Sequence, residues 1–224
     1  MKESLLALGS FLLLTLSFPA AHAGNTATSS YEDTAYIRVI TERAGKIVAT
    51  LGLPDSAAYL RVRGIVANQY KDLNAVYTDR DDHLKQLKDQ QPAAGKATAD
   101  SIKKNIQQDV DTRVEKLHTA YLARLRKELT PRQVDQVKDG MTYSVLEVTY
   151  KAYQEMLPSL TDEQKKRILS DLTEAREHAM DAESSRKKHE WFGKYKGRIN
   201  NYLSSQGIDM KRAEEDWKLR RAQG

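Results

Sequence analysis

The sequence predicts an all-α fold, in which a long antiparallel helical hairpin packs with several shorter helices in one bundle-like domain. Apolar residues recur at spacings of three and four over most of the chain, and no stretch alternates apolar and polar residues as a half-buried strand does. The chain has 224 residues and no cysteine. It is long enough to bury a sizeable core, and its stability must come from helix packing rather than from disulfides.

The N-terminus has the pattern of a cleavable signal peptide. Lys2 precedes an apolar run over residues 5–18, and Ala21-His22-Ala23 gives the small-x-small pattern of a cleavage site. The apolar run is too short for a permanent membrane anchor. We therefore expect a signal peptide over 1–23, a flexible polar leader over 24–31, and an α-helical domain over 32–224 that is periplasmic or secreted.

The first helix is expected to begin near Glu32 and to end at Gly52, which Leu53-Pro54 follows. Asp55 is a suitable N-cap for a second, longer helix. Apolar residues at helical spacing mark the buried face of this second helix: Tyr59, Val62, Val66, Tyr70 or Gln69, Leu73, Tyr77, Leu84 and Leu87.

A loop is expected over 91–95, where proline and glycine interrupt the pattern, and Thr98 or Asp100 is expected to cap the helix that follows. The apolar face of this third helix is regular: Ile102, Ile106, Val110, Val114, Leu117, Tyr121 and Leu125. Two long amphipathic helices joined by a short loop predict an antiparallel hairpin.

The second half of the sequence predicts five shorter helices. Pro131, Pro158 and Gly207 interrupt the helical pattern in this part of the chain. The helix that starts at Asp162 is expected to turn Ile168, Leu172, Ala175 and Ala179 inward. We expect these helices over 131–139, over 142–156, from 162 onward, over 191–205 and from 209 onward.

The tetrad Leu129-Thr130-x-x-Gln133 recurs as Leu160-Thr161-x-x-Gln164. Each is expected to start a helix, because the threonine hydroxyl can accept from the amide three residues later while the glutamine reaches back to the threonine amide. The repeated tetrad also resembles the Leu-Thr-x-x-Gln signature of Spy-type periplasmic chaperones, which hold unfolded clients without ATP. Capping alone is a complete explanation of both tetrads.

A second resemblance extends over nearly the whole chain after the leader. The tract over 178–203, the stretch Gly207-Ile-Asp-Met-Lys, the early Thr41-Glu-Arg-Ala-Gly-Lys-Ile-Val and the central tract over 61–70 are similar to a family of exported helical proteins. This is the family of domain of unknown function number 3826, which is typical of Bacteroidota and often encoded beside pectin-degradation genes. The resemblance implies export and sugar binding, and it implies no catalytic residues.

The best candidate site is the helix over 187–202, which carries cations beside aromatic rings. At about 100° per residue, cationic and aromatic side chains share one face or the face beside it. The predicted ligand-binding residues are Lys187, Trp191, Lys194, Tyr195, Arg198, Asn201 and Tyr202. Arginine and lysine pair with carboxylates, and aromatic rings stack on sugars. The alternative is that this apolar face is core and that the charges form its solvated rim.

No catalytic, metal or cofactor-binding pattern is present in the sequence. The cluster Glu174, Glu177, His178 and Asp181 lacks the spacing of a di-iron helix, and we interpret it as a solvated charged face. The formal net charge of +5 is mildly basic. In an exported protein this charge favours an anionic glycan over nucleic acid, which we do not expect as a partner. No stable membrane anchor is expected after the signal peptide is cleaved.

These observations predict an exported, non-catalytic protein that binds an acidic, pectin-type oligosaccharide. One alternative is a Spy-like ATP-independent periplasmic chaperone. Another is a lyase that acts on a uronate-containing glycan and takes its base, a lysine, arginine or tyrosine, from the face over 187–202.

Overall fold

The computed structural model describes residues 26–223, and the elements in this range are helices, as the sequence predicts. The predicted signal peptide lies outside the described residues. Helix α1, Thr26–Val48, begins within the segment expected to be a flexible leader, and the short 3-10 turn η1, Ala49–Leu51, follows it. Gly52 ends this turn with a φ of 61°, which glycine adopts without steric cost.

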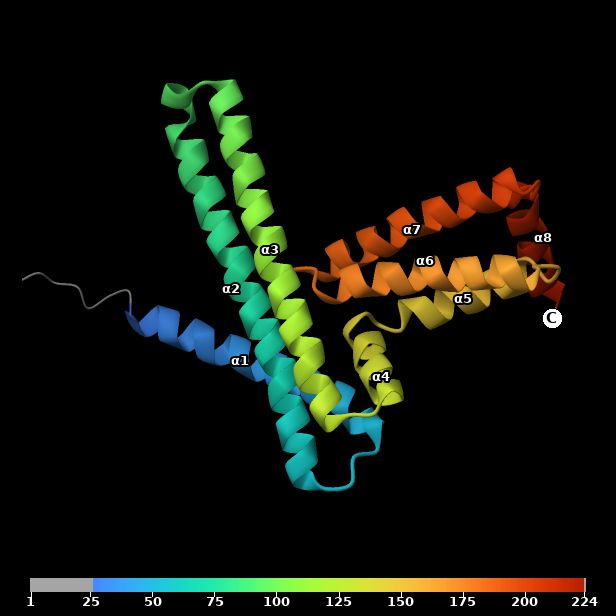
Figure 1. The fold of residues 1–224 in the computed structure, drawn as a ribbon, viewed down its shortest axis with the longest axis horizontal. Coiled ribbons are helices and arrows are strands. Elements are labelled where there is room, and N and C mark those ends of the chain that lie inside the picture. The colour runs from blue at the N-terminus through green and yellow to red at the C-terminus, as the bar shows by residue number, and fades with distance from the viewer. Residues whose placement is uncertain (1–25, 224) are drawn as a thin grey trace, which may run out of the picture. The chain divides into compact units, whose positions relative to one another are not determined.

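Helices α2, Ser56–Ala94, and α3, Lys96–Glu128, form the predicted hairpin and run side by side (Figure 1). The predicted cap of α2 is confirmed, because an Asp55 carboxylate oxygen accepts from the Ala58 amide at 2.7 Å. The predicted loop over 91–95 is wrong. Helix α2 continues to Ala94, and Gly95, with a φ of 70°, reverses the chain and precedes α3 in place of Thr98 or Asp100.

Helices α4, Pro131–Met141, and α5, Val145–Met156, are joined by a tight turn. Helix α4 passes through the break predicted at 139–140. Tyr143 and Ser144 then adopt positive φ values of 59° and 53°, which side-chain-bearing residues rarely do. This turn is the reason that α5 begins later than the predicted residue 142.

Helices α6, Asp162–Met180, α7, Ser185–Ser205, and α8, Met210–Gln223, complete the fold. Helix α7 begins before the predicted residue 191, because Ser184 caps it by accepting from the Lys187 amide at 3.2 Å. Both predicted capping boxes are confirmed, at Thr130 with Gln133 and at Thr161 with Gln164. The two tetrads are therefore accounted for by helix capping.

Helices α5, α6 and α7 bury a shared apolar core. Ile168 and Leu172 from α6 are fully buried, and they pack in one cluster with Phe192 and Ile199 from α7 and with Tyr153 from α5. Figure 1 shows α6 and α7 running alongside each other. This packing fixes which face of α7 is turned away from the core and is therefore available to a ligand. Within the described part of the chain, no helix combines the length and the apolar character needed to cross a bilayer.

Candidate functional site

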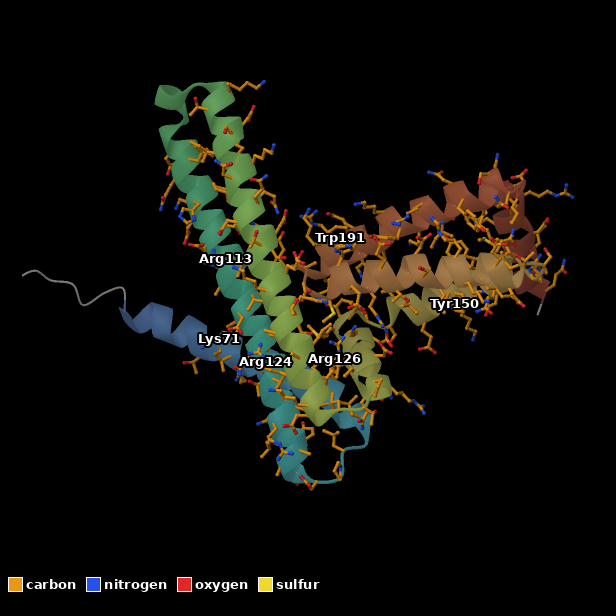
Figure 2. The ribbon with its side chains drawn as sticks, viewed as in Figure 1. Lys71, Arg113, Arg124, Arg126, Tyr150 and Trp191 are labelled. Atoms are coloured by element: carbon orange, nitrogen blue, oxygen red, sulfur yellow. The ribbon has the colours of Figure 1, made fainter. Side chains whose placement is uncertain are left out.

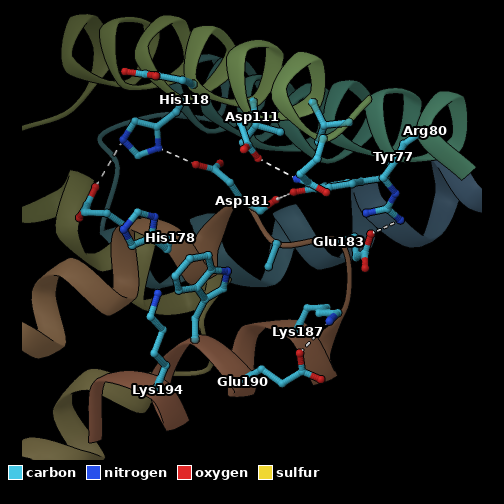
Figure 3. A pocket seen from close by; sticks show the side chains of 17 residues that line it. Tyr77, Arg80, Asp111, His118, His178, Asp181, Glu183, Lys187, Glu190 and Lys194 are labelled. Atoms are coloured by element: carbon cyan, nitrogen blue, oxygen red, sulfur yellow. Dashed lines mark hydrogen bonds and ion pairs between the residues drawn. The ribbon is translucent and has the colours of Figure 1, made fainter. Parts of the chain in front are cut away.

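A cleft of about 860 Å³ lies where α2 and α3 approach the junction of α6 and α7. Its volume is within the range of about 300–1,000 Å³ that is usual for ligand sites. Both long helical pairs contribute to its walls, so residues far apart in the sequence meet there (Figure 3). The lining residues are Tyr77, Arg80, Gln107, Val110, Asp111, Val114, Glu115, His118, Glu177, His178, Asp181, Ala182, Glu183, Lys187, Glu190, Trp191 and Lys194.

The N-terminal half of α7 supplies the aromatic part of the cleft. Trp191 is half-buried, and the His178 ring stacks on it with centroids 4.4 Å apart. The Lys194 ammonium lies 4.8 Å from the centroid of the Trp191 ring. Trp191 lies on the side of α7 that faces α3 (Figure 2). Lys187 is also in the lining, and its ammonium pairs with Glu190 at 2.8 Å.

Three of the predicted site residues, Lys187, Trp191 and Lys194, therefore line the cleft, and the other four do not. Tyr195 is 3% exposed, and its hydroxyl donates to Glu174 at 2.7 Å. Burial and the Glu174 carboxylate raise the pKa of this phenol. Tyr195 thus serves the contact between α6 and α7 rather than an open surface.

Arg198 is occupied by carboxylates of α6. Its guanidinium pairs with Glu174 at 3.0 Å and with Asp171 at 3.2 Å, and it lies over the Tyr195 ring at 4.9 Å. The half-buried Tyr202 ring carries Arg167 at 5.2 Å, and Asn201 is exposed on α7. These residues follow one side of α7 as the sequence indicates, but they lie beyond the end of the cleft.

Asp181, at the C-terminal end of α6, is the central polar residue of the cleft floor. Its side chain is 7% exposed and accepts from Gln69 Nε2 at 3.2 Å and from His118 Nδ1 at 2.6 Å. Its main-chain oxygen accepts from the Tyr77 hydroxyl at 2.9 Å. The predicted solvated face on α6 is thus wrong for Asp181, because helices α2 and α3 cover that end of α6 and supply its partners.

The His118 imidazole is fixed by Asp181 and stands next to a second carboxylate. Its Nε2 atom lies 3.6 Å from Glu177 Oε2. The hydrogen bond to Asp181 raises the pKa of His118, since the carboxylate stabilises the imidazolium form. The imidazole is thereby held in one orientation at the edge of the cleft.

Ion pairs join α6 to α4 beside this floor. Lys138 binds both oxygens of Glu177, at 2.8 and 2.9 Å. The buried Arg176 binds Asp135 and Asp139, each at 2.7 Å. Buried charges without partners would be costly, and here each is paired across the two helices. The floor is therefore set by contacts between elements and does not depend on a ligand.

The opposite end of the cleft is closed by Tyr77, Arg80 and Glu183. Arg80 pairs with Glu183 at 2.5 Å and lies over the Tyr77 ring at 5.0 Å. Burial, with Asp181 and Glu183 nearby, raises the pKa of Tyr77 to about 12. The phenol therefore stays protonated near neutral pH and acts as a hydrogen-bond donor.

The lining favours binding of a polar ligand. It contains no serine, threonine or cysteine that could act as a nucleophile. Among the described residues, no group of three or more histidine or acidic side chains is placed to hold a metal ion. Aromatic faces and carboxylates, amides and amines that can exchange hydrogen bonds are what a polyhydroxylated molecule such as a sugar can use.

His118 and Asp181 are among the lining residues that sequence reasoning did not predict. His118 and Asp181 are 63 positions apart in the sequence, and Gln69 and Asp181 are 112 positions apart. One local signal was present: His118 stands at helical spacing from Val114 and Tyr121, on the apolar side of its helix. A histidine at such a position indicates a buried polar partner, but only the fold identifies that partner as Asp181.

The comparison with known families gives one match. A family model described as protein of unknown function, DUF3826, matches residues 37–222. No curated protein matches the sequence. The matched residues include the whole cleft described above.

Proposed function

Since the chain belongs to the DUF3826 family of proteins of unknown function, we propose a function from the cleft, which is to bind an acidic oligosaccharide. In this proposal a sugar ring stacks on Trp191 and a sugar carboxylate pairs with Lys194. The observation that carries this proposal is the pairing of the half-buried Trp191 indole with Lys194, which has no carboxylate partner among the residues that the structure describes.

Trp191 supports the proposal as a preformed stacking surface. The His178 ring stacks on the indole with centroids 4.4 Å apart, and the α6–α7 core holds the helix from which Trp191 projects. A rigid aromatic face needs little reordering when a ligand binds, so less conformational entropy is lost. The C–H faces of a pyranose ring are apolar and suit such a surface.

Lys194 supplies the positive charge that an acidic sugar requires. Within residues 26–223, its only charged or aromatic contact is the Trp191 ring at 4.8 Å. A carboxylate that reaches the ammonium would form a charge-assisted bond without breaking an existing ion pair. Lys187 is less available, because Glu190 already holds it at 2.8 Å.

Calorimetric titration of the purified protein with short galacturonate oligomers tests this proposal. Trp191→Ala and Lys194→Ala should each weaken binding by about tenfold or more, in line with 1–3 kcal/mol for a stacked ring or a charge-assisted bond. Lys196→Ala is the matched control, because Lys196 is exposed on the same helix but lies outside the lining. Equal affinities of all three variants and the unmodified protein would contradict the proposal.

We also propose that the protein is exported, on the pattern over residues 1–23. Sequencing the N-terminus of protein secreted from a bacterial host should find Gly24 first. A mature protein that still begins at Met1 would contradict export by this route.

A further inference from the structure

The two walls of the cleft differ in the charge that they leave free. The lining holds six carboxylates, Asp111, Glu115, Glu177, Asp181, Glu183 and Glu190, against three lysine or arginine side chains, Arg80, Lys187 and Lys194. A strictly anionic ligand therefore meets a surface that is, on balance, acidic. The position of the unpaired groups decides where an acidic unit can lie.

Most of these charges are already paired inside the protein. Glu177 is held by Lys138, Glu183 by Arg80, Glu190 by Lys187, and Asp181 by His118. Such pairs contribute little net field to a ligand, because each carboxylate is compensated at short range. What remains for recognition is a smaller set on two different helices.

On the α3 wall the unpaired groups are acidic. Asp111 accepts from Gln107 Nε2 at 2.8 Å, and Glu115 stands one helical turn further along. Neither carboxylate has a lysine, arginine or histidine partner among the described residues. Both carboxylates belong to the lining of the cleft.

On the α7 wall the unpaired charge is positive. Lys194 is there with Trp191, and Figure 3 shows Asp111 on the α3 side of the opening and Lys194 on the α7 side. Ionised carboxylates accept hydrogen bonds and repel other carboxylates, so the α3 wall favours sugar hydroxyls over uronate groups. The α7 wall, with Lys194, favours uronate groups over sugar hydroxyls.

We propose that the ligand is a mixed oligosaccharide, in which an acidic unit at Trp191 and Lys194 is joined to a neutral unit whose hydroxyls donate to Asp111 and Glu115. This inference rests on the proposed saccharide binding and adds its specificity. A run of consecutive uronates is disfavoured, because its second carboxylate would face the acidic wall.

The test compares three probes by calorimetry with the full chain: a galacturonate trimer, a trisaccharide with one galacturonate between two neutral hexoses, and a neutral galactose trimer. The mixed probe should bind at least about tenfold more tightly than either of the others at low salt. The Asp111→Asn, Glu115→Gln double variant should bind the galacturonate trimer at least about fivefold more tightly than the unmodified protein does, because the repulsion is gone.

Asp109→Asn is the matched control, because Asp109 lies on α3 and pairs with Arg113 outside the lining. It should leave the preference unchanged. If the galacturonate trimer binds as tightly as the mixed probe and the double variant does not alter this, the inference is overturned while saccharide binding stands. If none of the three probes binds, the proposed function is overturned and the inference falls with it.

Discussion

Replacing Asp181 by asparagine is expected to lower the free energy of unfolding by about 2–3 kcal/mol near pH 6. The carboxylate is 7% exposed and accepts at 2.6 Å from His118, so solvent screens this charge-assisted hydrogen bond little. Asparagine keeps the shape and one acceptor oxygen. The loss should therefore be smaller than the about 3–5 kcal/mol expected when one partner of a buried ion pair is removed.

The effect of this substitution should depend on pH with a definite sign. Asp181 raises the pKa of His118 above its ordinary value of 6.5. The stabilisation from the charged imidazole is therefore complete below pH 6.5 and is lost as the pH rises through the folded-state pKa. Burial lowers the pKa of Lys188 to about 8, and Asp181 opposes this shift by favouring the charged ammonium, so the attraction between Lys188 and Asp181 is also lost as the pH rises through about 8. The destabilisation by Asp181→Asn should therefore shrink between about pH 6 and about pH 9.

Urea denaturation followed by far-ultraviolet circular dichroism measures this difference. Asp109→Asn is a matched control, because its carboxylate pairs with Arg113 but is 62% exposed, and an exposed pair contributes at most about 1 kcal/mol. If Asp181→Asn costs no more than the control, or if its cost does not change with pH, Asp181 does not have the role in the cleft floor that its contacts indicate.

Three further predictions concern the stability effect of single residues in α4, in α7 and at the start of α6. Gly197→Ala should raise the free energy of unfolding by about 0.5–1 kcal/mol, because an added Cβ has no neighbour within 4 Å in this helix; a loss on urea denaturation would contradict it. Gly140→Ala should lower it by about 1–3 kcal/mol, because the new Cβ would meet Ile47 Cγ2 at 2.9 Å; an unchanged urea midpoint would show that Ile47 can move away. Thr161→Ala should cost about 1 kcal/mol by the loss of its capping box, and thermal unfolding at the same midpoint as the unmodified protein would rule out that contribution.

The helices of this chain could be predicted from sequence because their signals are local. Apolar spacing located the hairpin, and the Thr130 and Thr161 boxes marked two helix starts correctly. Two of the errors fell where a single backbone conformation decides the outcome. Gly95 reverses the chain without a loop, and the positive φ values of Tyr143 and Ser144 delay α5. No feature of the side-chain pattern signals the positive φ values of Tyr143 and Ser144.

The cleft could be predicted only in part, because it forms between segments that are distant in sequence. Trp191 and Lys194 were found from their place on one helix face. The same reasoning grouped Tyr195 and Arg198 with them, because helical periodicity cannot show that Glu174 of the neighbouring helix takes up both side chains. Asp181 was interpreted as solvated for the same reason: the residues that bury it come from α2 and α3.

The most direct test of saccharide binding at the cleft uses the indole signals of the two tryptophans in a ¹H–¹⁵N spectrum. Trp191 lines the cleft, whereas Trp217 lies on α8 and serves as an internal control. Titration with the mixed trisaccharide should shift the Trp191 indole signal in a saturable way and leave the Trp217 signal in place. A Trp191 signal that stays unchanged while the saccharide binds, or a shift confined to Trp217, would contradict binding at this cleft.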